Sequence, residues 1–246
     1  MIKLLRNSQR LHVKQGRQDI WSSCIDAFGF LVAFDELRLP KGDSTEPHCD
    51  DETELVTYVY KGALSQEDTT GKSGVVHAGE FQCMSTGARI RHIETSVSRS
   101  DWVHFFRISL RPSQLGLAPG HEQAHFTAGQ RRNVLCVVAS PDGRKESLRI
   151  QQNALIYSSI LDPGHHFVHE LEPKRSAWLH MIYGEATLND IVLTTGDGVG
   201  VSSERSLSLT VHETTEILLV DLGPLKSCPC ERVSCPEDAR LQQGEH

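Results

Sequence analysis

The chain has 246 residues, which is long enough for one large domain or for two domains of about 120 residues each. Hydrophobic residues make up 38% of it and charged residues 23%, an ordinary balance for a soluble globular protein. The formal net charge of -7 argues against a general nucleic-acid-binding protein, which normally carries a basic face, so no direct nucleic-acid contact is expected.

The N-terminal residues and the cysteines predict a cytoplasmic protein with no membrane partner. Residues 1–10 lack the long apolar run of a secretory signal, and the longest apolar run, 27–34, is far too short to cross a bilayer. The seven cysteines are odd in number and mostly scattered, which does not suit a disulfide framework.

Short runs rich in Val, Ile, Leu and Phe alternate with glycine and proline, a pattern typical of strands joined by turns. In chain order, strands are expected at Phe30–Leu39, Glu54–Tyr60, Val103–Leu110, Val134–Ala139, Ala154–Leu161, Trp178–Tyr183, Ser206–Val211 and Glu216–Asp221. The polar segment Ser113–Gln130 is expected to cross between two units. No long helix is expected, and so many closely spaced strands indicate a sandwich or barrel.

Both halves of the chain repeat one order of features: strand, glycine turn, strand, Gly-acid turn, strand. The matching landmarks are Gly62, Gly79-Glu80 and Pro112 in the first half and Gly184, Gly196-Asp197 and Pro224 in the second. The repeat indicates duplication of one small barrel, with chance similarity as the alternative. We therefore expect an all-β chain with an N-terminal metal-binding barrel (1–127), a C-terminal barrel without metal (128–225) and a polar tail (226–246).

Two segments carry candidate metal ligands in pairs. On a strand, alternate residues share a face, so His48 and Asp50 can point into a barrel together, and so can His92 and Glu94. Two histidines with carboxylates suit Fe(II), Mn(II), Ni(II) or Zn(II), and an open-sided set of this kind occurs in non-haem iron oxygenases. Each pair alone is more often a surface strand, but the two pairs together favour a metal site.

The second half lacks such pairs. His92 and Glu94 follow Gly79 by thirteen and fifteen residues, and the same steps from Gly196 lead to Leu209 and Val211. Apolar residues at these positions predict a hydrophobic core in the second half rather than a second metal site. In the tail, Cys228, Cys230 and Cys235 indicate a mobile, oxidation-prone segment in preference to a soft-metal site.

The chain resembles the pirin family of the cupin superfamily. The resemblance rests on Gly79-Glu-Phe-Gln-Cys-Met-Ser85, Ile90-Arg-His-Ile-Glu94, Glu54-Leu-Val-Thr-Tyr-Val-Tyr-Lys-Gly62 and Ser140-Pro-Asp-Gly143, and it runs in order from about Asp19 to Pro224. It implies two cupin-type (jelly-roll) barrels in tandem, with iron or a related metal held in the first barrel by three histidines and one glutamate.

Carried over by position, His48 matches the first family histidine, and His92 and Glu94 match the third histidine and the glutamate. Asp50 then stands where the family has its second histidine, which hardens the site and favours Mn(II) or Fe(II) over Cu. A second register, with a two-residue gap, places Glu46 on the first histidine and His48 on the second.

Three functions follow as hypotheses. The resemblance implies a metal-dependent dioxygenase, with Fe(II) expected first, that cleaves flavonols such as quercetin, and in which Glu94 takes the proton of a small aromatic or enolic substrate. The alternative is a redox-sensitive iron protein that binds a protein partner without turnover. A third reading is a metal-free scaffold, supported by Asp50. Two further residues near the site stay open: Glu54 as a ligand or a buried acid, and His104 as a residue that orients a ligand or an interior histidine.

Overall fold

Strands make up most of the computed structural model, which describes residues 1–24, 28–46, 48–49, 53–69, 71, 73–85, 91–99, 102–113 and 120–224. The first half holds β1 (Ile2–Leu5), β2 (Leu11–Gln15), β3 (Gln18–Cys24), β4 (Leu31–Pro40), β5 (His48–Cys49), β6 (Glu54–Lys61), β7 (Ala63–Asp68), β8 (Ser73–His77), β9 (Glu80–Ser85), β10 (Arg91–Ser96), β11 (Trp102–Leu110) and β12 (Gly120–His125).

The second half of the described chain is also built of strands. It holds β13 (Cys136–Ser140), β14 (Leu148–Arg149), β15 (Ala154–Leu161), β16 (His166–Glu170), β17 (Ser176–Tyr183), β18 (Glu185–Leu188), β19 (Ile191–Thr194), β20 (Gly198–Ser202), β21 (Ser206–Val211) and β22 (Thr215–Leu222). The helical elements are short: η1 (Asn7–Gln9), α1 (Ala128–Arg131) and η2 (Arg144–Glu146).

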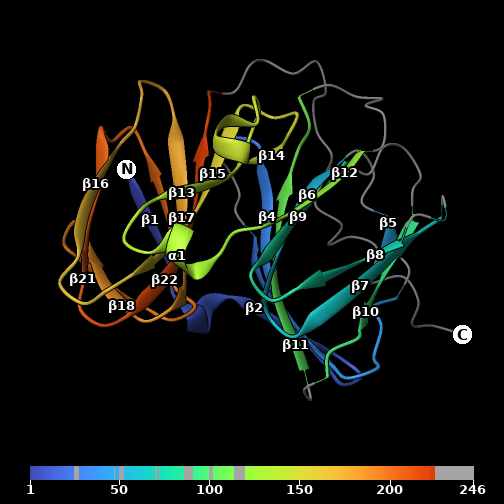
Figure 1. Cartoon of the computed structure of the whole chain (residues 1–246). Coiled ribbons are helices and arrows are strands. Elements are labelled where there is room, and N and C mark those ends of the chain that lie inside the picture. Colours follow the sequence, from blue (N-terminus) through green and yellow to red (C-terminus); the bar gives the residue numbers. More distant parts are fainter. Residues whose placement is uncertain are drawn as a thin grey trace, which may run out of the picture.

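Two barrels stand side by side, each made of a seven-stranded and a four-stranded sheet (Figure 1). The first barrel has the strand orders β12-β9-β6-β11-β4-β3-β2 and β5-β10-β7-β8. The second has β1-β20-β17-β22-β15-β13-β14 and β16-β21-β18-β19, so β4 to β11 correspond in order to β15 to β22. The predicted all-β fold of two tandem barrels is confirmed, and so is the duplication.

All eight strands expected from the sequence are present, with ends within a few residues of the prediction. The strands that the sequence did not reveal are mostly short and carry polar residues, such as β7 (ALSQED) and β8 (SGVVH). Alternating or short patterns of this kind have little apolar signal, because one face of each strand meets solvent.

One strand lies outside the half of the fold in which the sequence would place it, and another forms within the segment expected to cross between the halves. β1 pairs with β20, Ile2 opposite Val201, so the first residues of the chain extend the sheet of the second barrel. β12, within the expected crossing segment, pairs with β9 of the first barrel in the equivalent position. The division between residues 127 and 128 stays a prediction. β1 precedes that division in the sequence but belongs to the sheet of the second barrel.

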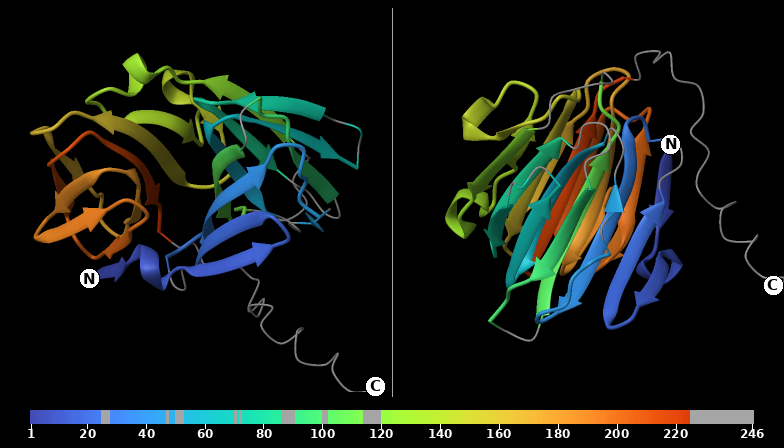
Figure 2. Two further views of the ribbon diagram at one scale, coloured as in Figure 1. Left: turned by 90° about the horizontal axis from the view of Figure 1, so that it is seen from below. Right: turned by 90° about the vertical axis from the view of Figure 1, so that its right-hand side faces the viewer.

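The barrels share one hydrophobic core, formed where β4, β6 and β11 face β15, β17 and β22. Phe34, Val56, Phe106, Trp178 and Val220 belong to this cluster, and none is more than 1% exposed. Figure 2 shows the large sheets of the two barrels turned toward each other. A contact this apolar makes the two barrels one cooperative unit.

Gly62 and Gly184 make equivalent turns, at the ends of β6 and β17. Their φ angles are +88° and +99°, in the region that favours glycine. A Cβ on Gly62 would lie 2.7 Å from the carbonyl oxygen of Trp102, and one on Gly184 would lie 2.5 Å from that of Thr214. Both turns therefore require glycine, which explains why they were visible as landmarks in the sequence.

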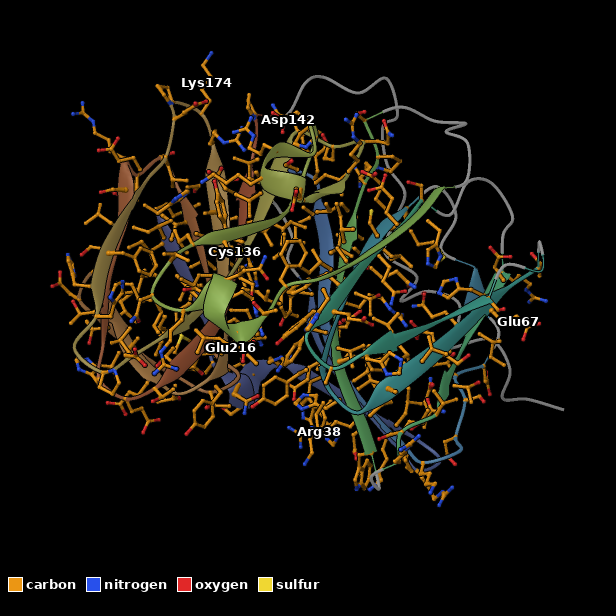
Figure 3. The ribbon with its side chains drawn as sticks, in the orientation of Figure 1. Arg38, Glu67, Cys136, Asp142, Lys174 and Glu216 are labelled. Atoms are coloured by element: carbon orange, nitrogen blue, oxygen red, sulfur yellow. The ribbon has the colours of Figure 1, made fainter. Side chains whose placement is uncertain are left out.

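A polar network crosses the interface beside the apolar core. The Tyr58 hydroxyl donates to Oε1 of Glu216 (2.5 Å), and the Arg131 guanidinium donates to the same oxygen (2.7 Å). Glu216, labelled in Figure 3, lies next to α1, from which Arg131 extends. Burial, together with the charge of Glu216, raises the pKa of Tyr58 far above its ordinary value, so the phenol stays protonated.

His180 of β17 is fully buried between the barrels. Its ring centroid lies 4.3 Å from that of Phe34 and 5.8 Å from that of Phe106. Neither ring nitrogen has a hydrogen-bond partner among the described residues. Burial lowers the pKa of His180 to about 3, and the nearby positive charge of Arg10 adds to the effect while Glu36 opposes it.

No helix in the described part of the chain is long and apolar enough to span a membrane.

His180 should make the protein less stable in mild acid. The unfolded chain binds its proton near pH 6.5 and the native chain near pH 3, so this part of the stability is present above pH 6.5 and is lost progressively below it. Between pH 7.5 and 5.0 the loss amounts to about 2 kcal/mol. Chemical denaturation of wild type and His180→Leu at both pH values should show a smaller acid loss in the variant; equal losses would contradict the assignment.

Candidate metal centre

Strand β10 aims three polar side chains into the first barrel. Its burial alternates, and His92, Glu94 and Ser96 are each no more than 2% exposed. Because successive side chains on a strand point to opposite faces, these three share the inner face. His92 and Glu94 therefore lie on the same inner face of β10, as the spacing in the sequence predicts.

The carboxylate of Glu94 is held on both oxygens. Oε1 accepts a hydrogen bond from Nε2 of Gln66 on β7 (3.0 Å), and Oε2 is bonded to the guanidinium of Arg107 on β11. The Glu94 and Arg107 side chains are only 1% and 10% exposed. The backbone is fixed as well, since the Glu94 amide donates to Oγ1 of Thr45 (3.0 Å). A buried ion pair of this kind orders the carboxylate inside the barrel.

Arg107 belongs to a polar row that runs across three neighbouring strands. Thr57 on β6 lies opposite both Arg107 and Gln82 of β9, so the three side chains share the inner face. Nε2 of Gln82 lies 3.0 Å from Nε2 of His121. Oε1 of Gln82 and Oε1 of Gln66 are buried without a hydrogen-bond partner among the described residues. Buried carbonyl oxygens of this kind normally bind water or a ligand.

His48 lies opposite His92 in the pairing of β5 with β10. Directly opposite residues of antiparallel strands are close neighbours, so the backbone brings the two histidine positions together. Asp50 lies outside the described residues, and the position of the His48 side chain is not described either. Glu46, which the gapped register would use, is exposed. Among the described side chains, no three His, Cys, Asp or Glu residues gather closely enough to hold a metal ion.

The polar cluster occupies one end of the first barrel, and apolar residues fill the other. Leu39, Val59, Leu64, Val103 and Phe105 form a separate hydrophobic cluster, each no more than 1% exposed. The apolar end closes and stabilises the barrel, so the polar end does not need to supply the core.

The second barrel provides an internal comparison, because each polar position of the first can be matched by strand pairing. Glu94 lies opposite Gln66, and Leu209 lies opposite Leu188 four residues after the equivalent glycine. Arg107 lies opposite Thr57, as Leu219 lies opposite Leu179. The matched residues of the second barrel (Leu179, Leu188, Leu207, Leu209 and Leu219) are all buried in one aliphatic core.

This comparison corrects one detail of the sequence count. Leu209 matches Glu94 rather than His92, and Leu207 matches His92, because the segment between the Gly-acid turn and this strand is two residues shorter in the second barrel. The expectation that Leu209 and Val211 are core residues is confirmed, since both are at most 1% exposed.

Glu54 and His104 face away from this cluster, toward the second barrel. Oε1 of Glu54 accepts a hydrogen bond from the amide of Gln151 (2.5 Å), and burial raises the pKa of Glu54. Nε2 of His104 lies 2.9 Å from Oε1 of Glu36, which also binds Arg38. Glu54 is therefore a buried structural acid. His104 contacts Glu36 on the side of the second barrel and does not orient a metal ligand.

Comparison with known families gives two matches that together span most of the chain. Residues 9–109 match the family described as Pirin, and residues 137–222 match the family described as Quercetinase C-terminal cupin domain. A quercetin 2,3-dioxygenase of Escherichia coli (strain K12) is 32% identical over 236 residues, covering 92% of this chain and 100% of the relative. A pirin-like protein of Caulobacter vibrioides is 29% identical over 195 residues, covering 79% and 84%.

Solved structures share the same two-barrel architecture. The bacterial pirin YhhW of Escherichia coli, in complex with nickel(II), matches with a TM-score of 0.84 at 30% identity, covering 92% of this chain and 100% of that one. A quercetin 2,3-dioxygenase structure from Acinetobacter baumannii matches with a TM-score of 0.78 at 16% identity, covering 94% and 89%, which speaks for the fold.

The leucines of the second barrel suggest a double-mutant test of the Glu94–Arg107 pair. Glu94→Leu alone should lower the free energy of unfolding by about 3–5 kcal/mol, because it breaks the buried ion pair and leaves the charge of Arg107 without this carboxylate. Glu94→Leu with Arg107→Leu reproduces the arrangement of the second barrel and should recover most of that loss. Chemical denaturation of both variants decides it, and simple additivity of the two single losses would show that the pair is not coupled.

Proposed function

Because this chain belongs to the pirin family, we propose that it is a metal-dependent dioxygenase that opens flavonols such as quercetin. The observation that supports this most is the enclosed polar cluster around Glu94 in a barrel whose duplicate is filled with leucine. The fold alone does not require that polarity, since the second barrel has the same strand order with an aliphatic interior. The relatives named quercetin 2,3-dioxygenase supply the substrate class.

The residues present fit a divalent metal. The buried imidazole of His92 and the carboxylate of Glu94 are ligands of the type that iron, nickel and zinc take, and the backbone of His48 lies next to His92. The carbonyl oxygens of Gln66 and Gln82, unpartnered among the described residues, could accept hydrogen bonds from a bound water or a substrate hydroxyl. We propose His48, Asp50, His92 and Glu94 as the ligands and Fe(II) as the native ion.

When bound, the metal would supply Lewis acidity toward an enolic oxygen and a place for dioxygen. The protein itself would orient and deprotonate the substrate. Glu94 would accept the proton of the substrate hydroxyl on its carboxylate, and Gln66 would hold that carboxylate in place through Oε1. The apolar cluster below the site would exclude water from the reacting groups.

A redox-sensitive, partner-binding role stays a second prediction. No feature of the described residues favours it over turnover of a small molecule.

Oxygen uptake with quercetin tests the activity. Iron-loaded wild type should consume oxygen in the presence of quercetin, and Glu94→Ala should lower the rate by at least about a hundredfold because the substrate proton has no acceptor. Glu67→Ala is the matched control: Glu67, labelled in Figure 3, follows Gln66 on β7 but is exposed. Absence of uptake across a panel of flavonols would dispose of the proposed activity.

Elemental analysis of protein purified without added metal tests the ligands. Wild type should carry about one divalent ion per chain, expected to be iron, and His92→Ala should lose it. His166→Ala, which removes an exposed histidine of the second barrel, should retain the metal. Full metal content in His92→Ala would show that the ion binds elsewhere.

A further inference from the structure

The buried ion pair inside the first barrel has a consequence for metal binding. Arg107 and Gln66 together use both oxygens of Glu94, so the carboxylate already has a cation as its partner. A metal ion bound to the same carboxylate would lie within a few ångströms of the guanidinium. Two positive charges at that distance in a buried site repel each other strongly.

We propose that Arg107 competes with the metal ion for the carboxylate of Glu94 and so weakens the affinity of the site for metal. The inference rests on the proposed metal site and goes beyond it, because it assigns a role to a residue that is not a ligand. Binding of the metal requires the guanidinium to give up Oε2 of Glu94 or to share that oxygen with the ion. When the guanidinium gives up this oxygen, the positive charge of the metal ion takes the place of the positive charge of Arg107 beside Glu94.

The internal duplicate supports a special role for Arg107. Its counterpart Leu219 is a core residue, so the position accepts an apolar side chain without loss of the barrel. Packing alone therefore does not require an arginine at this position, and its guanidinium contacts the buried carboxylate of Glu94.

Titration calorimetry with Ni(II) as the probe tests the competition. Arg107→Gln keeps hydrogen-bond donors but removes the charge, and it should bind Ni(II) at least about tenfold more tightly than wild type. Arg107→Lys keeps the charge and should stay within about threefold of wild type. Arg175→Gln is the matched control: it removes a buried arginine from a buried pair with Asp221 in the second barrel and should leave the affinity unchanged.

Thermal unfolding gives an independent readout that a purely structural role would not produce. Without metal, Arg107→Gln should be less stable than wild type, since Glu94 loses its cation. Added Ni(II) should raise its melting temperature more than that of wild type. If Arg107→Gln folds only when Ni(II) is present, the ion has replaced the guanidinium, which supports the competition.

Three results would overturn the inference: Ni(II) affinity in folded Arg107→Gln equal to or weaker than in wild type, an unfolded variant that Ni(II) does not rescue, or no Ni(II) binding by either protein. Failure of the dioxygenase proposal is a separate outcome. A protein without quercetin turnover whose Arg107→Gln variant binds Ni(II) tenfold more tightly would retain the competition and lose the activity.

Discussion

Burial of the same strands on both faces is the constraint on which this structure depends. Every residue from 54 to 59 in β6 and from 105 to 110 in β11 is buried, so each strand has two inner surfaces. One surface packs against the partner barrel and the other lines its own barrel. Because the interface supplies a large apolar core, the interior of the first barrel can carry buried polar groups and still belong to a stable fold.

The repeated strand order allows the interiors of the two barrels to be compared position by position. Two barrels with the same strand order differ inside: one holds Gln66, Glu94 and Arg107, and the other holds Leu188, Leu209 and Leu219 at the matching positions. Buried charges cost free energy unless they are paired, and a leucine core avoids that cost. The shared fold therefore does not require the buried polar groups of the first barrel, which points to a role for them other than folding.

The sequence predicted the large sheets and the inner face of β10 because these depend on local signals. The runs from Phe30, Glu54 and Ala154 are long and apolar, and His92 and Glu94 stand two apart on one strand. It missed Gln66 and Arg107 because their meeting depends on the pairing of β7 and β11 with other strands. Comparison of Phe105-Phe-Arg107 with Ile217-Leu-Leu219 contained the signal: a charge in one repeat at a leucine of the other.

The position of β1 sets a rule for how the chain can assemble. Ile2 must pair with Val201, far along the chain, so β1 is synthesised long before β20, the strand with which it pairs. Such a long-range closure slows folding and favours a late docking step. It also means that a fragment ending after the first barrel would leave β1 as an unpaired edge, open to aggregation or exchange between molecules.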